Sequence, residues 1–394
     1  MSPILSIVIP TKNRYEYLLV LIQALLKSQK NNFEIIVQDN SDDNSTFLPF
    51  IHSIQDSRLR YNYNKNWLSV CDNCDIGVGL SKGSYVCMLG DDDGIMPWAI
   101  EFSEWMLENN FDAAVINKVG YNWPDVTSKV WNEAMSGNIS LPVYKFSISN
   151  VNVDEEINNV VFKGGTTLGK LPRVYHGIVL KKRLDELKTT TGTYFPGPSP
   201  DMANAVGLGT CCKNVCYVDY PLIISGHSVK STGGQGAKGE HHGKIEDQNF
   251  LPKGTKDNWT RDIPLFWSGS TILAESVLKS LSNTKSFKLR DRFNFKYLYA
   301  SCFLFEPRYS KEIYAAIKEK YKGLSIVTAL IGVSYFYMVL FFKRLRIFIR
   351  NFLLLKLKIK DKKRSYNGCP NIDAAITTIE AHFVNANSNW IWKK

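Results

Sequence analysis

Short apolar runs alternate with helical patterns over the first part of the chain, and this alternation restricts the fold more than any other feature. Residues 5–9 and 33–38 are strand-like runs that end in polar residues. Between them, apolar residues recur on one helical face over residues 18–26. A weaker helical pattern covers residues 68–81, and a further apolar run, 85–89, follows it. This order predicts an α/β domain with a mostly parallel central sheet flanked by helices.

Polar side chains follow three of the predicted strands directly. Thr11 comes after the first strand, Asp39 after the second, and the aspartates 91–93 after the run 85–89. Ligands of such sheets bind beyond the carboxyl ends of the strands. We therefore expect these side chains to gather at one edge of the sheet and to form a site there.

The three adjacent aspartates need a neutralising partner. Like charges on adjacent residues repel, and a buried carboxylate is unfavourable by several kcal/mol unless something compensates for it. A cation, a set of backbone N–H donors or open water can satisfy the run, and a solvated acidic turn is the plainest alternative. Hard divalent cations such as Mg²⁺ and Mn²⁺ prefer carboxylate oxygens, which makes the run a candidate metal site.

Four stretches together resemble the family 2 glycosyltransferases, whose GT-A fold is a Rossmann-like domain that binds a nucleotide-sugar. They are "SIVIPTKNR" (6–14), "EIIVQDNSDD" (34–43), "GLSKGSYVCMLGDDDGIMP" (79–97) and, more loosely, "PGPSPDMANAV" (196–206). The first three occur in the family's order and at about its spacing, and the resemblance covers roughly the first 230 residues. It implies an inverting, metal-dependent enzyme of the hexosyltransferase class.

The resemblance assigns roles within the acidic run. The family's D-S-D-D pattern falls on residues 90–93, so Gly90 stands in place of the first acid. Asp92 is the expected ligand of Mn²⁺ or Mg²⁺, joined by Asp93, and Asp91 is expected to contact the ribose or another part of the donor. His227 either completes the metal shell or is only a loop histidine. The metal would stabilise the diphosphate leaving group as a Lewis acid.

Other matched positions are expected to bind the nucleotide. Asp39 matches the residue that accepts a hydrogen bond from the base, although it could also cap the next helix. The remaining matched positions line the family's nucleotide pocket, and they are Pro10, Thr11, Asn13 and Arg14.

One departure from the family concerns the donor's diphosphate. Many relatives have Arg-Asn where this chain has Cys74 and Asp75, so one basic group is missing. We expect Asp75 to remain a substrate contact. We expect Lys82, or a residue of the glycine-rich stretch 225–243, to supply the missing positive charge.

Asp201 is the expected general base. The family needs one carboxylate to take the proton from the acceptor hydroxyl, and the loop around Asp201 resembles the one that carries it. Because a helix-like run follows, an N-cap is the alternative role.

Two cysteine clusters raise the question of a zinc site. They are Cys71-x-x-Cys74 and Cys211-Cys212-x-x-x-Cys216, and the second lacks the usual ligand spacing. The eight cysteines fit reduced thiols in a reducing compartment better than a zinc site or a disulfide framework.

The C-terminal part differs in composition from the rest. Residues 324–394 hold 12 Lys and Arg against 3 Asp and Glu, whereas the whole chain has a net charge of +11. Residues 324–342 contain no charge and approach the length of a bilayer span. Residues 343–364 are basic and amphipathic, with Leu345, Phe348, Phe352, Leu355 and Ile359 on one helical face. This pattern favours an anionic membrane surface over nucleic acid, which usually meets a basic stripe on the folded body.

Monotopic attachment is favoured over a span, because a span would carry the basic segment outward against the positive-inside tendency. A buried core helix would account for 324–342 but not for the basic run. No basic and apolar leader opens the chain, so we expect a location at the cytoplasmic face of the membrane.

The chain is therefore expected to have four parts. Residues 1–230 form the GT-A catalytic domain, and 231–322 form a glycine-rich loop and a helical extension. Residues 323–364 anchor the protein, and 365–394 form a tail. The expected function is transfer of a sugar, from a UDP-sugar by preference, to a glycan or lipid-linked acceptor in cell-surface polysaccharide synthesis. The alternatives are a non-catalytic membrane scaffold and a sugar-nucleotide pyrophosphorylase.

Overall fold

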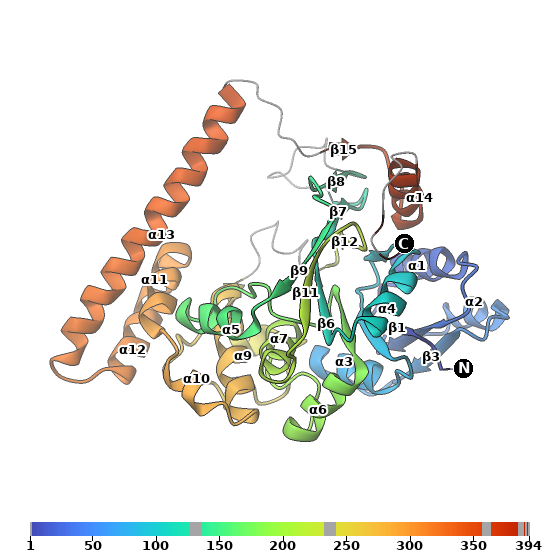
Figure 1. Cartoon of the computed structure of the whole chain (residues 1–394). Coiled ribbons are helices and arrows are strands. Elements are labelled where there is room, and N and C mark those ends of the chain that lie inside the picture. The colour runs from blue at the N-terminus through green and yellow to red at the C-terminus, as the bar shows by residue number, and fades with distance from the viewer. Residues whose placement is uncertain are drawn as a thin grey trace.

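An eight-stranded sheet, in the order β3-β2-β1-β4-β10-β6-β11-β9, forms the centre of the molecule (Figure 1). This computed structural model describes residues 2–126, 136–231, 242–356, 364–384, 390 and 392. Four of the pairings are parallel, and only β10 and β9 run against their neighbours, which confirms the expected α/β fold. The strands are β1 (Leu5–Thr11), β2 (Phe33–Asp39), β3 (Leu59–Tyr63), β4 (Tyr85–Met88), β6 (Ala113–Ile116), β9 (Ser147–Val151), β10 (Gly177–Leu180) and β11 (Val215–Asp219).

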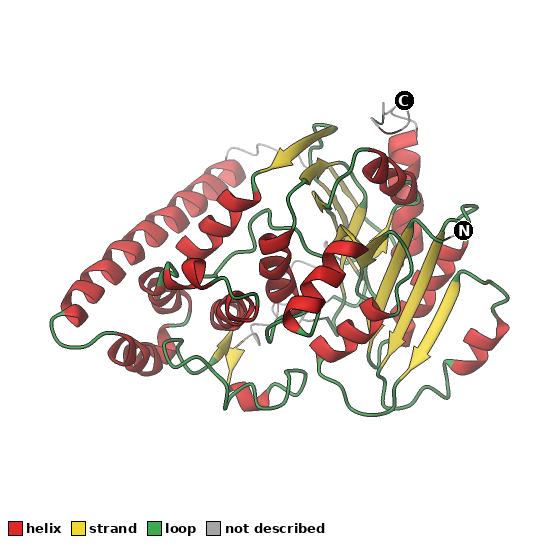
Figure 2. Cartoon of the chain, turned by 60° about the horizontal axis from the view of Figure 1, so that its bottom comes forward, coloured by secondary structure: helices red, strands yellow, loops and turns green. Residues whose placement is uncertain are grey.

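Helices cover both faces of this sheet, as Figure 2 shows, and each face has its own apolar core. β1 and β2 are buried along almost their whole length, so their sequences are continuously apolar rather than alternating. One face carries α3 (Val70–Gly79), α5 (Val153–Phe162), α6 (Lys181–Thr191), α7 (Pro200–Cys211) and α9 (Gly269–Asn283). The other carries α1 (Tyr15–Leu26) and α4 (Ala99–Glu108), while the short α2 (Leu48–Ser53) lies between β2 and β3.

The parallel register brings the strand ends level with one another. Thr11 lies opposite Asp39 across β1 and β2, and Val8 lies opposite Met88 across β1 and β4. Thr11 follows Val8 by three residues, and Asp91 follows Met88 by three. The Thr11 hydroxyl donates a hydrogen bond of 2.6 Å to Asp91 Oδ2. The side chains that follow the predicted strands therefore meet at one edge of the sheet, as expected.

A second sheet, in the order β15-β8-β7-β12-β5, packs beside that edge. Two of its strands come from the region that follows β6. Its strands are β5 (Gly94–Ile95), β7 (Val119–Asn122), β8 (Ile139–Leu141), β12 (Ile223–His227) and β15 (Arg364–Tyr366). A third, two-stranded sheet pairs β13 (His242–Gly243) with β14 (Trp267–Ser268), and a short 3-10 helix, η2 (Ile245–Asp247), follows β13. The glycine-rich residues 232–241 lie outside the described part of the chain.

The chain is helical after β14. The elements are α9, α10 (Phe287–Asp291), α11 (Phe295–Phe305), the 3-10 helix η3 (Pro307–Tyr309), α12 (Ser310–Lys320) and the 32-residue α13 (Ser325–Lys356). Within the described residues, α13 is the one helix long and apolar enough to cross a membrane by length and composition. Figure 1 shows it along the outer edge of the molecule, beside α11 and α12.

The C-terminal residues return to the N-terminal domain instead of forming the separate tail expected for 365–394. β15 pairs with β8, and α14 (Ile372–Val384) packs against α1. Lys27 of α1 forms an ion pair of 2.6 Å with Asp373 of α14. Ile372, Ile379 and Trp390 belong to the same apolar core as β1 and α1, so the last elements of the chain complete the N-terminal domain.

This return predicts that α14 supports the stability of the whole domain. Ile379 is fully buried, so Ile379→Ala should lower the free energy of unfolding by about 2–5 kcal/mol through lost contacts and a cavity. Thr377→Ala, at an exposed position of the same helix, is the matched control and should have little effect. Urea unfolding of the full-length protein measures both. If the two variants unfold alike, α14 is a tail that does not contribute to the domain.

Candidate active site

Asp93, the third aspartate of the turn after β4, fixes the conformation of that turn. Asp93 has no exposed surface, and its Oδ1 accepts a hydrogen bond of 2.8 Å from the Gly226 N–H. Its Oδ2 accepts from the Gly90 N–H at 2.7 Å and lies 2.6 Å from His176 Nε2. Burial raises the pKa of Asp93, but these partners outweigh it and hold the pKa below its ordinary value. Asp93 could become a metal ligand, as the sequence suggested, only by giving up some of these contacts.

His176 connects Asp93 to a lysine. Lys118 Nζ lies 2.7 Å from His176 Nδ1, so the lysine donates to this nitrogen while Nε2–H donates to Asp93. Burial lowers the pKa of His176, which favours this neutral tautomer. His176 precedes β10, and its backbone has a positive φ of 57°, which is uncommon for a residue with a side chain. β10 runs antiparallel to β4, so β10 begins beside the end of β4. His176, which precedes β10, therefore reaches the aspartate turn.

β12 closes against the turn from the other side. Gly226 approaches so closely that a Cβ there would lie 1.7 Å from the Asp92 carbonyl oxygen, so only glycine fits. The Trp123 indole N–H donates to the same carbonyl at 2.8 Å. The Ser228 hydroxyl and N–H donate to Asp92 Oδ2 at 2.6 and 3.1 Å. The neighbour that the structure brings to Asp92 is therefore Ser228 and not His227, whose ring lies 3.4 Å from the Tyr121 carbonyl.

Arg14 lies between the other two carboxylates. Its guanidinium is 3.1 Å from Asp91 Oδ1 and 2.8 Å from Asp92 Oδ2. Burial raises the pKa of both carboxyls, that of Asp91 to about 7, although Arg14 opposes the shift. Burial also works against the charge of Arg14, but Asp91 and Asp92 together raise its pKa. Thus the site binds positive charge with two buried carboxylates that face the same group.

These residues fit a divalent cation only together with further ligands. Asp91 Oδ1 is buried and has no hydrogen bond, and the donor set is two carboxylates, which suits Mg²⁺ or Mn²⁺. Among the residues described, no group of three or more His, Cys, Asp or Glu is arranged to hold a metal by itself. Mg²⁺ commonly binds through one or two carboxylates plus substrate phosphates, so Asp91 and Asp92 would suffice in a complex with a diphosphate.

A pocket of about 960 Å³ opens beside the carboxylates. Its wall on the sheet side comes from the ends of β1 and β2, the start of α3 and the loop before it. The residues here include Pro10, Thr11, Arg14, Asn40, Trp67, Ser69, Asn73 and Asp91. Of the predicted nucleotide-pocket residues, the structure thus places Pro10, Thr11 and Arg14 on this wall.

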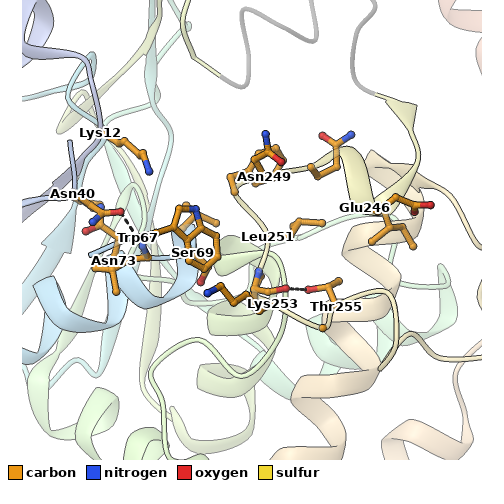
Figure 3. A pocket seen from close by; sticks show the side chains of 18 of the residues that line it. Lys12, Asn40, Trp67, Ser69, Asn73, Glu246, Asn249, Leu251, Lys253 and Thr255 are labelled. Atoms are coloured by element: carbon orange, nitrogen blue, oxygen red, sulfur yellow. Dashed lines mark hydrogen bonds between the residues drawn. The ribbon is translucent and has the colours of Figure 1, made fainter. Parts of the chain in front are cut away.

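The segment 245–257 forms the facing wall (Figure 3). The Val70 N–H donates to the Phe250 carbonyl at 2.9 Å, which fixes this segment against α3. Lys253 Nζ lies 5.1 Å from the centre of the Trp67 ring, a cation–π distance. Trp67 is 40% exposed and provides an aromatic surface that the sequence patterns did not identify.

Asp39 lies just behind the pocket and is fully engaged by the protein. Its Oδ2 accepts hydrogen bonds from the Tyr15 and Tyr61 hydroxyls at 2.7 and 2.6 Å, and its Oδ1 accepts from the Ser41 N–H at 2.8 Å. Burial raises the pKa of both tyrosines, so they stay protonated donors. α2 begins only at Leu48, so Asp39 does not cap it. Asp39 has no exposed surface, so a base could reach its carboxylate only after the side chains around it move.

Asn13 supports the same region from the loop after β1. Its backbone φ is 56°, its N–H donates to Ser41 Oγ at 2.7 Å, and its side-chain amide donates to Asp42 at 2.8 Å. It therefore joins the loops after β1 and β2 and does not line the pocket.

Two predicted substrate contacts lie elsewhere. Asp75 accepts hydrogen bonds from Lys188, Thr193 and the Tyr194 N–H, and so holds α3 to the end of α6. Lys82 precedes β4, and its N–H donates to Glu34 at the amino end of the sheet, opposite the site. The prediction for Lys82 fails because a residue before a parallel strand lies at the other edge. Positive charges near the carboxylates include Arg14, Lys118 and Arg173. Lys230, from the glycine-rich stretch 225–243, lines the pocket, as do Lys12, Lys253 and Lys256.

Asp201 lies in the first turn of α7, where Ser199 is the N-cap residue. Among the described residues, no group forms a hydrogen bond or an ion pair with its carboxylate. Burial raises its pKa, whereas the nearby charges of His176, Arg173 and Lys118 oppose that shift. Ser199, and not Asp201, is therefore the N-cap residue of α7, and the Asp201 carboxylate lies among the charged neighbours His176, Arg173 and Lys118.

Comparison with known proteins agrees with this architecture. Residues 6–157 match the family described as Glycosyl transferase family 2. The glycosyltransferase GlyG of Streptococcus pneumoniae is 30% identical over 127 residues, which are 32% of this chain and 42% of GlyG. The putative colanic acid biosynthesis glycosyl transferase WcaA of Escherichia coli is 29% identical over 97 residues, 24% of this chain and 35% of WcaA. The matched region thus spans less than half the length of these relatives.

A solved structure extends the likeness of the fold over most of the chain. Residues 1–349 of TarS from S. aureus, in complex with UDP-GlcNAc, superpose with a TM-score of 0.50 at 13% identity, covering 86% of this chain and 89% of that one. The expected family resemblance is confirmed in the segment that carries the strand-end residues of the site. Residues 6–157 thus carry the sequence pattern of glycosyl transferase family 2.

Proposed function

We propose that this protein transfers a sugar, with inversion, from a nucleotide-sugar to a glycan or lipid-linked acceptor during synthesis of a cell-surface polysaccharide. A UDP-sugar is the favoured donor, since UDP-GlcNAc is bound by the structural neighbour TarS. The observation that carries the proposal is a pocket lined by two different kinds of group. Trp67 offers an aromatic surface, and Asp91 with Arg14 forms a charged group.

These two kinds of group match the two parts of a nucleotide diphosphate. A base can stack on Trp67 while its polar edge meets amides such as Asn40 and Asn73 at the ends of the strands. The diphosphate then lies towards Asp91 and Asp92, which would hold Mg²⁺ or Mn²⁺. When bound, the metal would neutralise the charge that builds up on the leaving diphosphate. Arg14, and Lys118 and Arg173 nearby, bring the protein's own positive charges to the same carboxylates.

Asp201 is proposed to take the proton of the acceptor hydroxyl. The acceptor oxygen then forms a bond to the anomeric carbon from the face opposite the diphosphate, and the bond from that carbon to the diphosphate oxygen breaks. One displacement inverts the configuration, so a single carboxylate base is sufficient. The raised pKa of Asp201, which follows from burial, makes it a stronger base than an exposed aspartate.

The role of the acidic turn is tested by Asp92→Asn. The variant should keep its fold but lose metal-dependent nucleotide binding and turnover, because the charge that holds the cation is gone. Titration calorimetry with UDP, with Mn²⁺ and then with excess chelator, measures binding apart from activity. Asp43→Asn, an exposed neighbour of the pocket, should bind like the original protein. Full binding and turnover of the original protein in excess chelator would contradict the metal assignment.

The aromatic surface is tested by Trp67→Ala. Loss of stacking should weaken UDP binding by about 1–3 kcal/mol. The matched control is Tyr314→Ala on α12, which removes an aromatic ring of similar exposure (41%) away from the pocket. Equal UDP affinity in both variants would place the base elsewhere.

The base is tested by Asp201→Asn. Donor affinity should stay near normal. Turnover should fall by about 10²–10⁴-fold, because no base remains to take the proton of the acceptor hydroxyl. A loss of donor affinity and thermal stability in parallel with the loss of turnover would show that Asp201 is structural. Donor hydrolysis by the original protein, even without an acceptor, would argue against a non-catalytic scaffold.

A further inference from the structure

Helix α13 has two different halves. At 1.5 Å per residue its 32 residues extend about 48 Å. Its first half packs on α11 through one face, where Ala329 and Val333 are buried and Phe336 contacts Tyr297. From 341 to 353 every residue is exposed. The second half therefore extends beyond the folded body without a covering element among the described residues.

An apolar stripe runs along both halves on the side away from α11. Its members follow one another at spacings of three, four or seven residues, which keeps them on one helical face. Each is between 38% and 66% exposed, and they include Ile331, Met338, Phe342, Leu345, Ile349 and Phe352. A continuous exposed apolar face of this length marks a binding surface.

The basic residues of α13 indicate which kind of surface the apolar stripe contacts. At about 100° per residue, Lys343, Arg346 and Arg350 lie along one flank of the stripe, and α13 contains no acidic residue. Long basic side chains can keep their charges in the headgroup layer while the stripe enters the acyl boundary. In contrast, pairing of two copies through this stripe would bring like charges together with no acid on either helix.

Both ends of α13 are attached to the same body. Its start packs on α11, and the chain after it enters the domain as β15, paired with β8. Only seven residues, 357–363, separate α13 from β15. Fully extended they reach at most about 29 Å. A span would place the end of α13 across a hydrocarbon core of about 30 Å, and non-helical chain exposed to lipid would have to return through it.

We propose that α13 lies flat on an anionic membrane surface, with the stripe facing the lipid, and that it does not cross the bilayer. The catalytic domain is then held to the surface by a strap with both ends attached, rather than by a tail. This inference is independent of the proposed reaction, because membrane binding can be measured without donor or acceptor.

The test is co-sedimentation of the full-length protein with vesicles of phosphatidylcholine, with and without phosphatidylglycerol. Binding should be stronger with the anionic lipid and should weaken, but not vanish, at high salt. A matched pair of variants tests the stripe. Ile349 (47% exposed) lies on it and Ile347 (49% exposed) lies about 160° away on the same helix. Ile349→Asp should weaken binding about tenfold or more, and Ile347→Asp much less.

Four results would overturn the proposal. Equal effects of the two variants would show that the stripe does not meet the lipid, and indifference to phosphatidylglycerol would remove the role of the basic flank. Alkaline carbonate should release the protein from membranes, so retention would show a span. If Ile349→Asp instead converts a dimer to a monomer in sedimentation velocity without changing vesicle binding, a second copy covers the stripe.

Discussion

Three carboxylates are buried side by side at the end of β4, and the arrangement of the site follows from the need to compensate them. Each aspartate finds a different solution. Asp93 takes two backbone N–H groups and His176, Asp92 takes Ser228 and Arg14, and Asp91 takes Thr11 and Arg14. Because a buried carboxylate without partners is strongly unfavourable, these contacts join four separate stretches of the chain. The compensation is weakest at Asp91, whose Oδ1 lies 3.1 Å from the Arg14 guanidinium but accepts no hydrogen bond, so added positive charge would be favourable there.

The second sheet and the C-terminal return support this arrangement. β12 delivers Gly226 and Ser228 to the turn, and β7 leads to Trp123, which fixes the Asp92 carbonyl. β15 extends the same sheet through β8, and α14 packs on α1, the helix that follows Arg14. The last part of the chain is thus linked physically to the site. It also attaches the far end of α13, so this long exposed helix and the domain that carries the candidate site form one connected body.

Much of this protein could be predicted from local patterns. The alternation of strands and helices gave the α/β fold, since burial of both faces of a parallel sheet makes its strands continuously apolar. The edge at which Thr11, Arg14 and the aspartates meet also followed, because a residue after a parallel strand must lie at its carboxyl end. The same rule excludes Lys82 from the site, because Lys82 precedes its strand and lies at the opposite edge of the sheet. Asp39 lies at the expected strand end but behind the pocket, and Asn13 joins two loops and does not line the pocket. Their partners Tyr15, Tyr61 and Ser41 showed no pattern that would assign them.

The sequence by itself determined which elements form, in what order, and on which edge their polar ends collect, because these depend on periodicity over a few residues. Only the tertiary structure decided which groups share a partner. His176 reaches Asp93 across 83 residues of sequence and Ser228 reaches Asp92 across 136, from an antiparallel strand and a second sheet that carry no local signal. The orientation of α13 is of the same kind. Its apolar length permits a span, and only the pairing of β15 with β8, far from the helix in sequence, ties its end back to the domain.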